Sequence, residues 1–555
     1  MSPDFRFHPI GLALSALVLT TGPALAQQAP DAGRVLQDLQ LPQQSLPATL
    51  ELQVQPPAAS ANGADAGEQV ELRSVRFQGN TRVGSDALQA VVAPALGQRH
   101  SLAGLRALAD RVSAFYREQG YPFARAFLPA QRMAQGELLI EVIEGRYGRV
   151  AATGADARLA QQAQAFLAPL QSGEVIANDA LERSVLILSD QPGLRVRPVV
   201  RPGETVGTGD LEVEVQATPA LQGRVTVDNH GNRYSGQNRV LAEAAWSSPF
   251  TLGDRLSAAL LATDEALYFG QLNYSRPLGV NGWRGDIGYA LSDYSLGAEF
   301  APLRATGRAE VLSLGASYPL LRSNRANLVL GAQLQHKDMR DEYRATATRN
   351  DKSSTVLPLT LQFDARDAWL GAGVSYGSLA WTQGHLRLDG STQQALDAST
   401  ARSAGSFQKL NLDLTRLQAL PGGFVLSARV SAQWAGKNLD SSEDFVLGGS
   451  TGVRAYPRGE GAGDEGVLGQ IELRYGQGAL VPYAFYDAGH STTNRRPWLA
   501  TENHRSLSGA GLGLRATHGD WSLDGTVAWR HTGGAALSDT QQRDPRVWLS
   551  ASYRF

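Results

Sequence analysis

The larger C-terminal part of the chain, residues 223–555, is a succession of short segments in which apolar and polar residues alternate. A side-chain period of two is typical of a β-strand whose two faces meet different surroundings. Strands with lipid on one side and water on the other need this pattern, with aromatic residues at the interfaces. In the last segment one face carries Val547, Leu549, Ala551, Tyr553 and Phe555, and the other carries Ser550, Ser552 and Arg554.

We count about sixteen such segments and expect no helix among them. An open sheet of so many strands would leave unpaired edges in the membrane, so the sheet must close. The sequence therefore predicts a transmembrane antiparallel β-barrel over residues 220–555, with both ends on one side because the strand number is even. The expected strands begin near Arg224, Val240, Arg255, Leu267, Arg284, Ala309, Ala326, Val356, Val374, Phe407, Phe424, Val467, Val481, Ser506, Trp521 and Arg546.

The composition agrees with a barrel and removes several other classes of protein. The chain has 555 residues, 59 glycines and a hydrophobic fraction of 43%, yet its mean hydropathy is negative at -0.23. A soluble all-β protein could share this profile. A net charge of -2 argues against a nucleic-acid-binding protein. The absence of cysteine removes disulfides, zinc thiolate sites and a cysteine nucleophile.

The N-terminus has the features of a secretory signal. Arg6 precedes an apolar run at residues 10–20, and Ala24-Leu25-Ala26 offers a cleavage site. The run is shorter than the roughly 20 residues that a transmembrane helix needs. We therefore expect residues 1–26 to be a signal peptide that is removed from the mature chain.

Two segments of different character follow the signal. Residues 27–41 contain a possible short helix, with Val35, Leu36 and Leu39 on one side; a disordered tail is the alternative. Residues 42–68 are rich in Pro, Ala, Gln, Ser and Gly, which is the composition of a flexible linker. The possible helix would thus be attached through a long tether.

Residues 69–146 and 147–219 predict two copies of one small α+β module. The first reads strand, helix, helix, strand, strand, and the second repeats this order of helical and alternating patterns. One mixed α/β domain with the same elements is the alternative. The residues expected to begin or end helices are Ser101, Gly120, Asp156 and Asn178.

A stretch between two alternating segments, residues 445–466, is too rich in glycine and charge for an ordinary turn. It reads FVLGGSTGVRAYPRGEGAGDEG. Arg454 stands there among apolar residues and glycines, and a charge in such surroundings needs a partner. The pattern favours a loop that folds back and docks, and a solvated hairpin loop is the alternative. We interpret Asp464 and Glu465 as a solvated loop tip rather than as cation ligands.

Several short motifs, taken in their order and spacing, resemble one family. With these motifs the chain is similar to the two-partner secretion outer-membrane transporters (TpsB type) of the haemolysin/haemagglutinin activator-secretion family, whose periplasmic modules are called POTRA domains. The resemblance covers nearly the whole mature chain. The motifs are FQGNT at 77–81, QGYP at 119–122, GEL at 136–138, EVIEG at 141–145, LER at 181–183, LSDQPG at 188–193, RPGE at 201–204, DNHG at 228–231 and GDRL at 253–256.

The resemblance gives the glycine-rich loop a place in the barrel. It implies that residues from about 435 to 466 are the sixth extracellular loop, which folds into the barrel and carries a Val-Arg-Gly-Tyr/Phe tip. Here the tip consists of Val453, Arg454, Ala455 and Tyr456. Because alanine replaces glycine, the tip must adopt a backbone that a Cβ allows.

The resemblance also gives the loop a partner. The family's barrel-wall motif, Phe-x-Asp-x-Gly, matches Phe485, Asp487 and Gly489. A period of two places these three residues on one face of a strand, and a carboxylate that faces a lumen needs a cation or water. The resemblance implies that Arg454 pairs with Asp487 inside the barrel.

Transport without a catalytic step is the function that the resemblance implies. A large exoprotein with an N-terminal secretion domain would be captured unfolded in the periplasm and passed through the barrel to the surface or medium, without nucleotide, cofactor or metal. Residues 27–41 would be a plug helix, and outer-membrane lipid and the barrel assembly machinery would be further partners. Strand addition to an exposed sheet edge is a plausible mode of capture. The candidate edge consists of Phe123, Ala124, Arg125, Ala126, Phe127 and Leu128.

Other classes of protein fit the sequence less well. No nucleophile-elbow pattern is present, residues 509–513 are a strand of small residues rather than a phosphate loop, and the nine histidines have no metal-ligand spacing. We therefore do not expect an enzyme. An outer-membrane assembly factor would usually carry more periplasmic modules, or different ones, and a plain porin would carry none.

Overall fold

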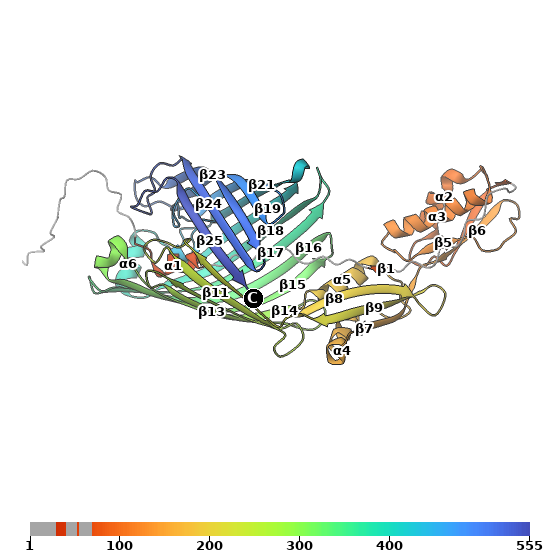
Figure 1. Cartoon of the computed structure of the whole chain (residues 1–555), viewed down its shortest axis with the longest axis horizontal. Helices are drawn as coiled ribbons and strands as arrows, with labels where there is room; N and C mark the ends of the chain where they lie inside the picture. The colour runs from red at the N-terminus through yellow and green to blue at the C-terminus, as the bar shows by residue number, and fades with distance from the viewer. Residues whose placement is uncertain (1–28, 40–52, 55–68) are drawn as a thin grey trace, which may run out of the picture.

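The computed structural model describes residues 29–39, 53–54 and 69–555, so the expected signal peptide and most of the linker lie outside the described residues. Figure 1 shows a barrel at one end of an elongated molecule and two small modules extending from it. Each barrel strand pairs antiparallel with its sequence neighbour, and β10 pairs with β25 to close the sheet. The sixteen strands confirm the expected fold class.

The observed strands begin close to most of the expected positions. Their bounds are β10 Leu221–Asp228, β11 Arg239–Ser247, β12 Arg255–Thr263, β13 Tyr268–Pro277, β14 Arg284–Ser295, β15 Ala305–Arg322, β16 Ala326–Tyr343, β17 Thr348–Asp367, β18 Gly373–Leu388, β19 Gly405–Ala419, β20 Phe424–Ala435, β21 Glu465–Tyr475, β22 Leu480–Thr492, β23 His504–His518, β24 Trp521–Thr532 and β25 Arg546–Arg554.

The largest difference between expected and observed strand starts is in β17, which begins at Thr348 rather than near Val356. Residues 349–355 are all polar, so no alternation of apolar and polar residues signals this part of the strand. The pairing of β17 with β16 and β18 nevertheless continues through it. Backbone hydrogen bonds thus extend the strand beyond its apolar segment.

The expectation of no helix within residues 223–555 is wrong. Helix α6, Ser391–Ser399, lies in the loop between β18 and β19. The buried carboxylate of Asp397 accepts hydrogen bonds from the backbone of Ser403 and Ala404 and from the Ser403 hydroxyl. This local tertiary contact, rather than a periodic apolar face, stabilises the helix. Three short 3₁₀ helices also occur there: η3 Ala298–Leu303, η4 Pro421–Gly423 and η5 Ser441–Glu443.

The outer face of the barrel is apolar, as its sequence pattern indicates. Large exposed side chains there include Leu312 and Leu314 on β15 and Leu379 and Trp381 on β18. Such a band is the surface that lipid requires around a transmembrane barrel. Within the described residues no helix has the length and apolar character needed to cross a membrane.

The two modules each contain their own apolar core. Separate cores favour two domains over one mixed domain. The first module consists of β2 Val70–Glu71, β3 Ser74–Gln78, α2 Ser85–Val92, η1 Ala93–Ala95, β4 Arg99–His100, α3 Leu102–Glu118, β5 Arg125–Phe127 and β6 Glu137–Ile143. The second consists of β7 Arg146–Thr153, α4 Ala157–Gln164, η2 Ala165–Leu167, α5 Asn178–Ser189, β8 Leu194–Pro202 and β9 Thr208–Ala217.

Three of the four expected helix boundaries agree with the structure. The side chains of Ser101 and Asp156 accept backbone hydrogen bonds at the starts of α3 and α4, and Gly120 follows α3 with a positive φ of 87°. Asn178 does not cap α5, since Ala177 precedes the helix instead. The backbone N–H of Asn178 donates to the carbonyl of Gly120 in the first module at 2.8 Å. A contact between modules therefore uses this residue.

The second module contacts the adjacent end of the barrel. Arg322, at the end of β15, donates two hydrogen bonds of 2.7 Å to the Asp190 carboxylate after α5. Arg183 in α5 donates to the carbonyl of Pro319 at 2.9 Å. Because bidentate arginine–carboxylate contacts restrict orientation, they hold this module at the barrel rim.

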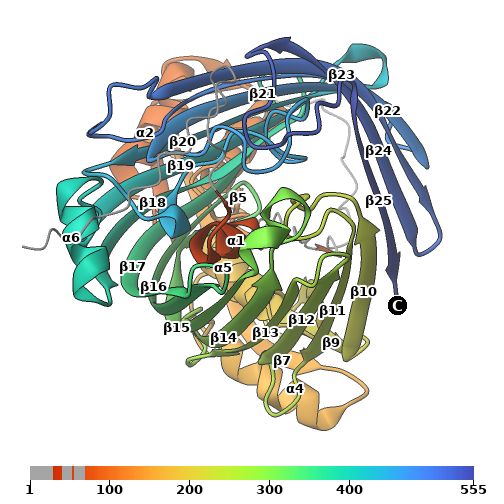
Figure 2. The same cartoon turned by 90° about the vertical axis from the view of Figure 1, so that its left-hand side faces the viewer.

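Helix α1, Ala32–Asp38, lies inside the barrel, where Figure 2 shows it surrounded by strands. Val35, Leu36 and Leu39 are buried there, packed in one cluster with barrel residues that include Phe269 and Met339. The strand β1, Gln53–Val54, pairs in parallel with β8 at the edge of the second module. The chain therefore runs from the barrel lumen to the second module before it forms the first.

The turn before β7 provides a test of the stability of the first module. The Glu144 carboxylate is 4% exposed and accepts hydrogen bonds from the backbone of Thr81 and Arg82, at 2.6 Å each, and from the hydroxyls of Thr81 and Tyr116. Burial alone would raise the pKa of Glu144, but these hydrogen bonds hold the pKa below its ordinary value.

We predict that Glu144→Gln destabilises the periplasmic segment 69–219 by about 3 kcal/mol at pH 7, because an amide N–H₂ faces donors that are left without an acceptor. Because folding lowers the pKa of Glu144, its ionised carboxylate stabilises the folded state above the ordinary pKa of about 4.3. This stabilisation is lost as pH falls through the pKa of the folded state. Urea unfolding at pH 7 and pH 3 should show that the difference between the variant and wild type shrinks at pH 3. A difference that is equal at both pH values would contradict this account.

Candidate functional site

The loop between β20 and β21, residues 436–464, folds back into the lumen; it is the sixth loop at the barrel end remote from the modules. Its tip residues Val453, Ala455 and Tyr456 are at most 1% exposed. They form one apolar cluster with barrel residues, including Phe485. The Tyr456 hydroxyl donates to the carbonyls of Thr532 and Gly534 at 2.8 and 3.0 Å. The tip is thus packed against the wall and hydrogen-bonded to the end of β24 and to the segment that follows it.

Arg454 lies in contact with Asp487, the residue that the resemblance assigned as its partner. Its Nε and Nη2 donate to the two Asp487 carboxylate oxygens at 2.9 and 2.8 Å, and its backbone N–H donates at 3.1 Å. Arg454 Nη1 donates to Glu472 at 2.9 Å. Asp487 is fully buried. A buried charge without such partners would be costly, so this network decides where the loop tip can lie.

The other two wall-motif residues surround this ion pair. The Arg454 guanidinium lies over the Phe485 ring, with 3.4 Å between its carbon and the ring centroid, a cation–π contact. A Cβ on Gly489 would lie 2.6 Å from a methyl group of Leu447 in the sixth loop. Glycine is therefore needed at this position to let the loop approach the strand.

Alanine at the loop tip is accommodated by a glycine in the wall. The backbone of Ala455 has no positive φ, so its Cβ causes no strain there. A Cβ added to Gly509 in β23 would lie 2.5 Å from the Ala455 methyl. The absence of a side chain at Gly509 thus leaves the room that Ala455 occupies.

Sequence reasoning did not find two residues that contact Arg454. In the sequence Glu472 lies on the polar face of an alternating segment, but this alternation does not indicate which cation the carboxylate contacts. Trp548 in β25 donates from its indole Nε1 to the Arg454 carbonyl at 2.7 Å. The sequence indicates only that Trp548 lies on the inner face of the last strand. The spacing of residues cannot show that its partner is a carbonyl of a distant loop.

Helix α1 is held in the same lumen by charged contacts as well as by its apolar packing. Asp31 caps its start and accepts from Lys352 at 2.8 Å, and the helix N–H of Ala32 donates to Asp341 at 2.9 Å.

The helix also contacts the sixth loop. Arg34 donates to Asp444 in the sixth loop at 3.0 Å. At the other end of the helix, Arg458 of the sixth loop donates to the side chain and carbonyl of Asp38. The loop and the helix therefore contact each other at two places.

Two acidic groups of the sixth loop have raised pKa values. Burial raises the pKa of Asp444 to about 7, with the nearby carboxylates of Asp464, Asp440 and Asp31 adding to the effect and Arg34 opposing it. Burial likewise raises the pKa of Asp464 to about 6.

The expectation that Asp464 is solvated is wrong, because it is 2% exposed and accepts backbone hydrogen bonds from Leu439 and Arg495.

The candidate edge strand is short and partly covered. Only residues Arg125–Phe127 form β5, which lies at the edge of a three-stranded sheet in the order β3-β6-β5. Ala124 and Ala126 are buried in the first core, and Phe123 packs against the core of the second module. Ser113 Oγ accepts the N–H of Ala126 at 2.8 Å and lies 3.4 Å from its carbonyl oxygen. A buried hydroxyl from α3 thus occupies the backbone groups at the middle of this edge.

No group of three or more His, Cys, Asp or Glu residues in the described part of the chain is arranged to hold a metal ion. The titratable groups described above are instead paired with arginine, lysine or backbone donors. The arrangement positions a loop and a helix in a lumen.

Comparison with known proteins identifies the family. The model of the family described as haemolysin secretion/activation protein ShlB/FhaC/HecB matches residues 207–516, more than half of the chain, and the model of the ShlB-type POTRA domain matches residues 70–145. The heme/hemopexin transporter protein HuxB of Haemophilus influenzae Rd is 27% identical over 483 residues, covering 85% of this chain and 84% of HuxB. The outer membrane transporter CdiB of Dickeya dadantii is 24% identical over 515 residues, covering 88% of each chain.

Solved structures show the same fold. CdiB from Escherichia coli superposes with a TM-score of 0.72 at 21% identity, covering 90% of this chain and 93% of CdiB. CdiB from Acinetobacter baumannii gives a TM-score of 0.64 at 18% identity, covering 91% and 95%. The chain belongs to the haemolysin secretion/activation family of two-partner secretion transporters, with its barrel in the outer membrane and its POTRA domains in the periplasm.

Proposed function

We propose that this chain captures one large unfolded exoprotein at its POTRA domains and moves it through the barrel to the outside. The observation that carries the proposal, beside the family itself, is a lumen filled by two parts of the chain that are not part of the wall. These are α1 and the sixth loop. An exported chain would take the space that these parts vacate.

The contacts of α1 suit a plug that leaves. The helix has seven residues, and three ion pairs with the wall and the sixth loop are among the polar contacts that hold it. Water can replace these ionic partners, and the apolar surface that the helix must expose on leaving is limited to a few side chains, including Val35, Leu36 and Leu39. The linker residues between the helix and β1 would give the helix the reach to move away while β1 stays paired with β8.

The position of the second POTRA domain supports delivery of the cargo to the pore. Its contacts through Arg322 and Arg183 hold it at the barrel rim. The outer edge of β8 is occupied by β1 of the same chain, so a strand that docked there would have to displace β1. We propose the edge of β5 as the first docking place, with the Ser113 hydroxyl yielding to the incoming strand.

Members of this family are transporters, and we propose that this chain has no enzymatic activity of its own. Folding of the cargo outside the cell would draw it outward without nucleotide. The proposed partners are an exoprotein with an N-terminal secretion domain, outer-membrane lipid at the apolar outer face, and the barrel assembly machinery during insertion.

Comparing the proteins of the culture medium and the outer membrane, with and without this gene, tests the proposed function. We expect one large protein to disappear from the medium while the other outer-membrane barrels stay at their normal level. The reason is that a dedicated transporter serves one cargo. Depletion of several barrels from the outer membrane would instead indicate an assembly factor.

A second prediction concerns the Arg454–Asp487 contact. We expect Arg454→Ala to lower secretion at least about tenfold while the amount of folded barrel is unchanged. The buried Asp487 loses its partner at a cost of about 3–5 kcal/mol to the docked loop, whereas the wall strands keep their own pairing. Secretion assays and heat-modifiable migration of the barrel measure the two effects.

Arg495→Ala is the matched control for this arginine. Arg495 follows β22, its side chain is about half exposed, and it pairs with Glu465 at 3.3 Å. We expect near-normal secretion from this variant, since surface ion pairs contribute little. Equal loss of folded barrel and of secretion in Arg454→Ala would contradict a specific role for Arg454 in transport.

A third prediction tests β5 as the docking edge. Ser113→Ala releases the backbone of Ala126, so we expect the secretion domain of the cognate exoprotein to bind the POTRA segment about threefold or more tightly, although the segment loses about 1–3 kcal/mol of stability. Adding Ala126→Pro to Ser113→Ala removes the N–H itself and should abolish this gain in affinity. Titration calorimetry measures both. Unchanged affinity in both variants would exclude β5 and leave the transport proposal standing.

A further inference from the structure

Glu460, four residues beyond Tyr456 in the sixth loop, is a buried carboxylate far from the wall motif in sequence and 1% exposed. It accepts hydrogen bonds from the backbone of Leu537 and Ser538 at 2.9 and 2.8 Å and from the Ser538 hydroxyl at 2.7 Å. The Arg505 guanidinium lies 2.7 Å from it. A carboxylate this deeply buried is stable only because these donors satisfy it.

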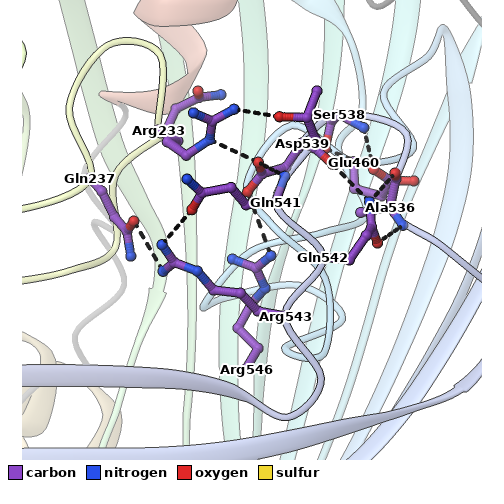
Figure 3. Close-up of polar contacts among 12 residues, drawn as sticks. Arg233, Gln237, Glu460, Ala536, Ser538, Asp539, Gln541, Gln542, Arg543 and Arg546 are labelled. Atoms are coloured by element: carbon purple, nitrogen blue, oxygen red, sulfur yellow. Dashed lines mark hydrogen bonds and ion pairs between the residues drawn. The ribbon is translucent and has the colours of Figure 1, made fainter. Parts of the chain in front are cut away.

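The donors to Glu460 belong to the extracellular end of the barrel. Arg505 lies at the start of β23, and Leu537 and Ser538 lie in the last extracellular loop, residues 533–545. Figure 3 shows Glu460 beside Ser538 of this loop. None of these residues contacts Arg454, Asp487 or Glu472 in the network described above. Glu460 therefore attaches the sixth loop at a second place, through a different set of contacts.

The last extracellular loop is itself held to the first. Asp539 accepts a hydrogen bond from Arg233 at 2.9 Å, and Arg543 donates to Gln237 at 3.2 Å (Figure 3). Arg233 and Gln237 lie in the loop between β10 and β11, residues 229–238. These contacts join the two loops that flank the junction where β25 meets β10. The sixth, last and first loops thus form one connected group at the extracellular mouth.

We propose that Glu460 is a positioning residue that keeps the extracellular mouth closed, and that its contacts with Leu537 and Ser538 must break before an exported chain can leave. The inference rests on the proposed transport function. It assigns the closure of the mouth to Glu460, and the placement of the loop tip on the wall to Arg454. The two attachments are then separable by mutation.

Glu460→Gln tests this separation in the full-length protein in planar lipid bilayers. The variant keeps the side-chain size, but its N–H₂ group must face one of two sets of donors, the Arg505 guanidinium or the N–H groups of Leu537 and Ser538, and that set loses its acceptor. We expect channel openings to be about tenfold more frequent, the factor that corresponds to about 1.4 kcal/mol. Heat-modifiable migration should stay as in wild type, because the wall and the Arg454–Asp487 contact are untouched.

Glu465→Gln is the matched control, since it makes the same change in charge. Glu465 is the first residue of β21, only partly buried, and pairs with Arg495 at 3.3 Å. We expect openings at the wild-type frequency from this variant. Equal frequencies in wild type and Glu460→Gln, or an equal increase in both variants, would overturn the assignment to Glu460.

A reversible cross-link provides a test that a merely structural role would not satisfy. The chain has no cysteine, so Glu460→Cys combined with Ser538→Cys introduces the only two thiols. Joining them with a short cleavable bis-thiosulfonate should stop secretion and channel openings, and reductive cleavage should restore both to the level of the untreated double variant. Secretion that continues while the loops are joined would overturn the proposal.

The two single cysteine variants, treated with the same reagent, control for modification without a link. If the untreated wild type exports no protein, the proposed transport function itself fails. If wild type exports its cargo and the linked protein does so equally well, only the role of Glu460 fails.

Discussion

A guanidinium buried against the inner face of a barrel wall must be neutralised, and the lumen is arranged around this requirement. The Arg454 side chain donates to Asp487 of β22 and to Glu472 of β21. It also lies over the ring of Phe485, and Trp548 of β25 donates to its carbonyl. The penalty for burying ions is recovered only when the geometry of the partners is good. The loop tip therefore has one well-defined place, and the neighbouring apolar residues pack around it.

The two parts that fill the lumen depend on each other. Arg458 of the sixth loop contacts the last turn of α1, and Asp444 contacts Arg34 nearer its start. Each POTRA domain, by contrast, is held together by an apolar core of its own. The POTRA domains thus rely on apolar cores of their own, whereas the parts proposed to move combine ion pairs with apolar clusters that they share with the barrel.

Much of this architecture could be predicted from the sequence, because it follows from periodicity. The alternation of apolar and polar residues predicts the barrel. The start of β17 is entirely polar and shows no alternation, and α6 has no apolar face with a helical period, so neither could be predicted. The pairing of Arg454 with Asp487 came from a family motif, since a period of two indicates only the face on which a carboxylate lies. Ser113 on the β5 edge, Asn178 between the modules and Trp548 on the loop carbonyl are tertiary contacts, and no spacing in the chain encodes them.

Ala455 and Gly509 are distant in sequence, but side chains at the two positions would compete for the same space. The methyl of Ala455 fills this space, and a Cβ at Gly509 would lie 2.5 Å from that methyl and 2.9 Å from the backbone carbonyl oxygen of Trp529. Among relatives of this chain, alanine at the loop tip should therefore be accompanied by glycine at the position of Gly509, so an apparent departure from a motif depends on a residue in another strand.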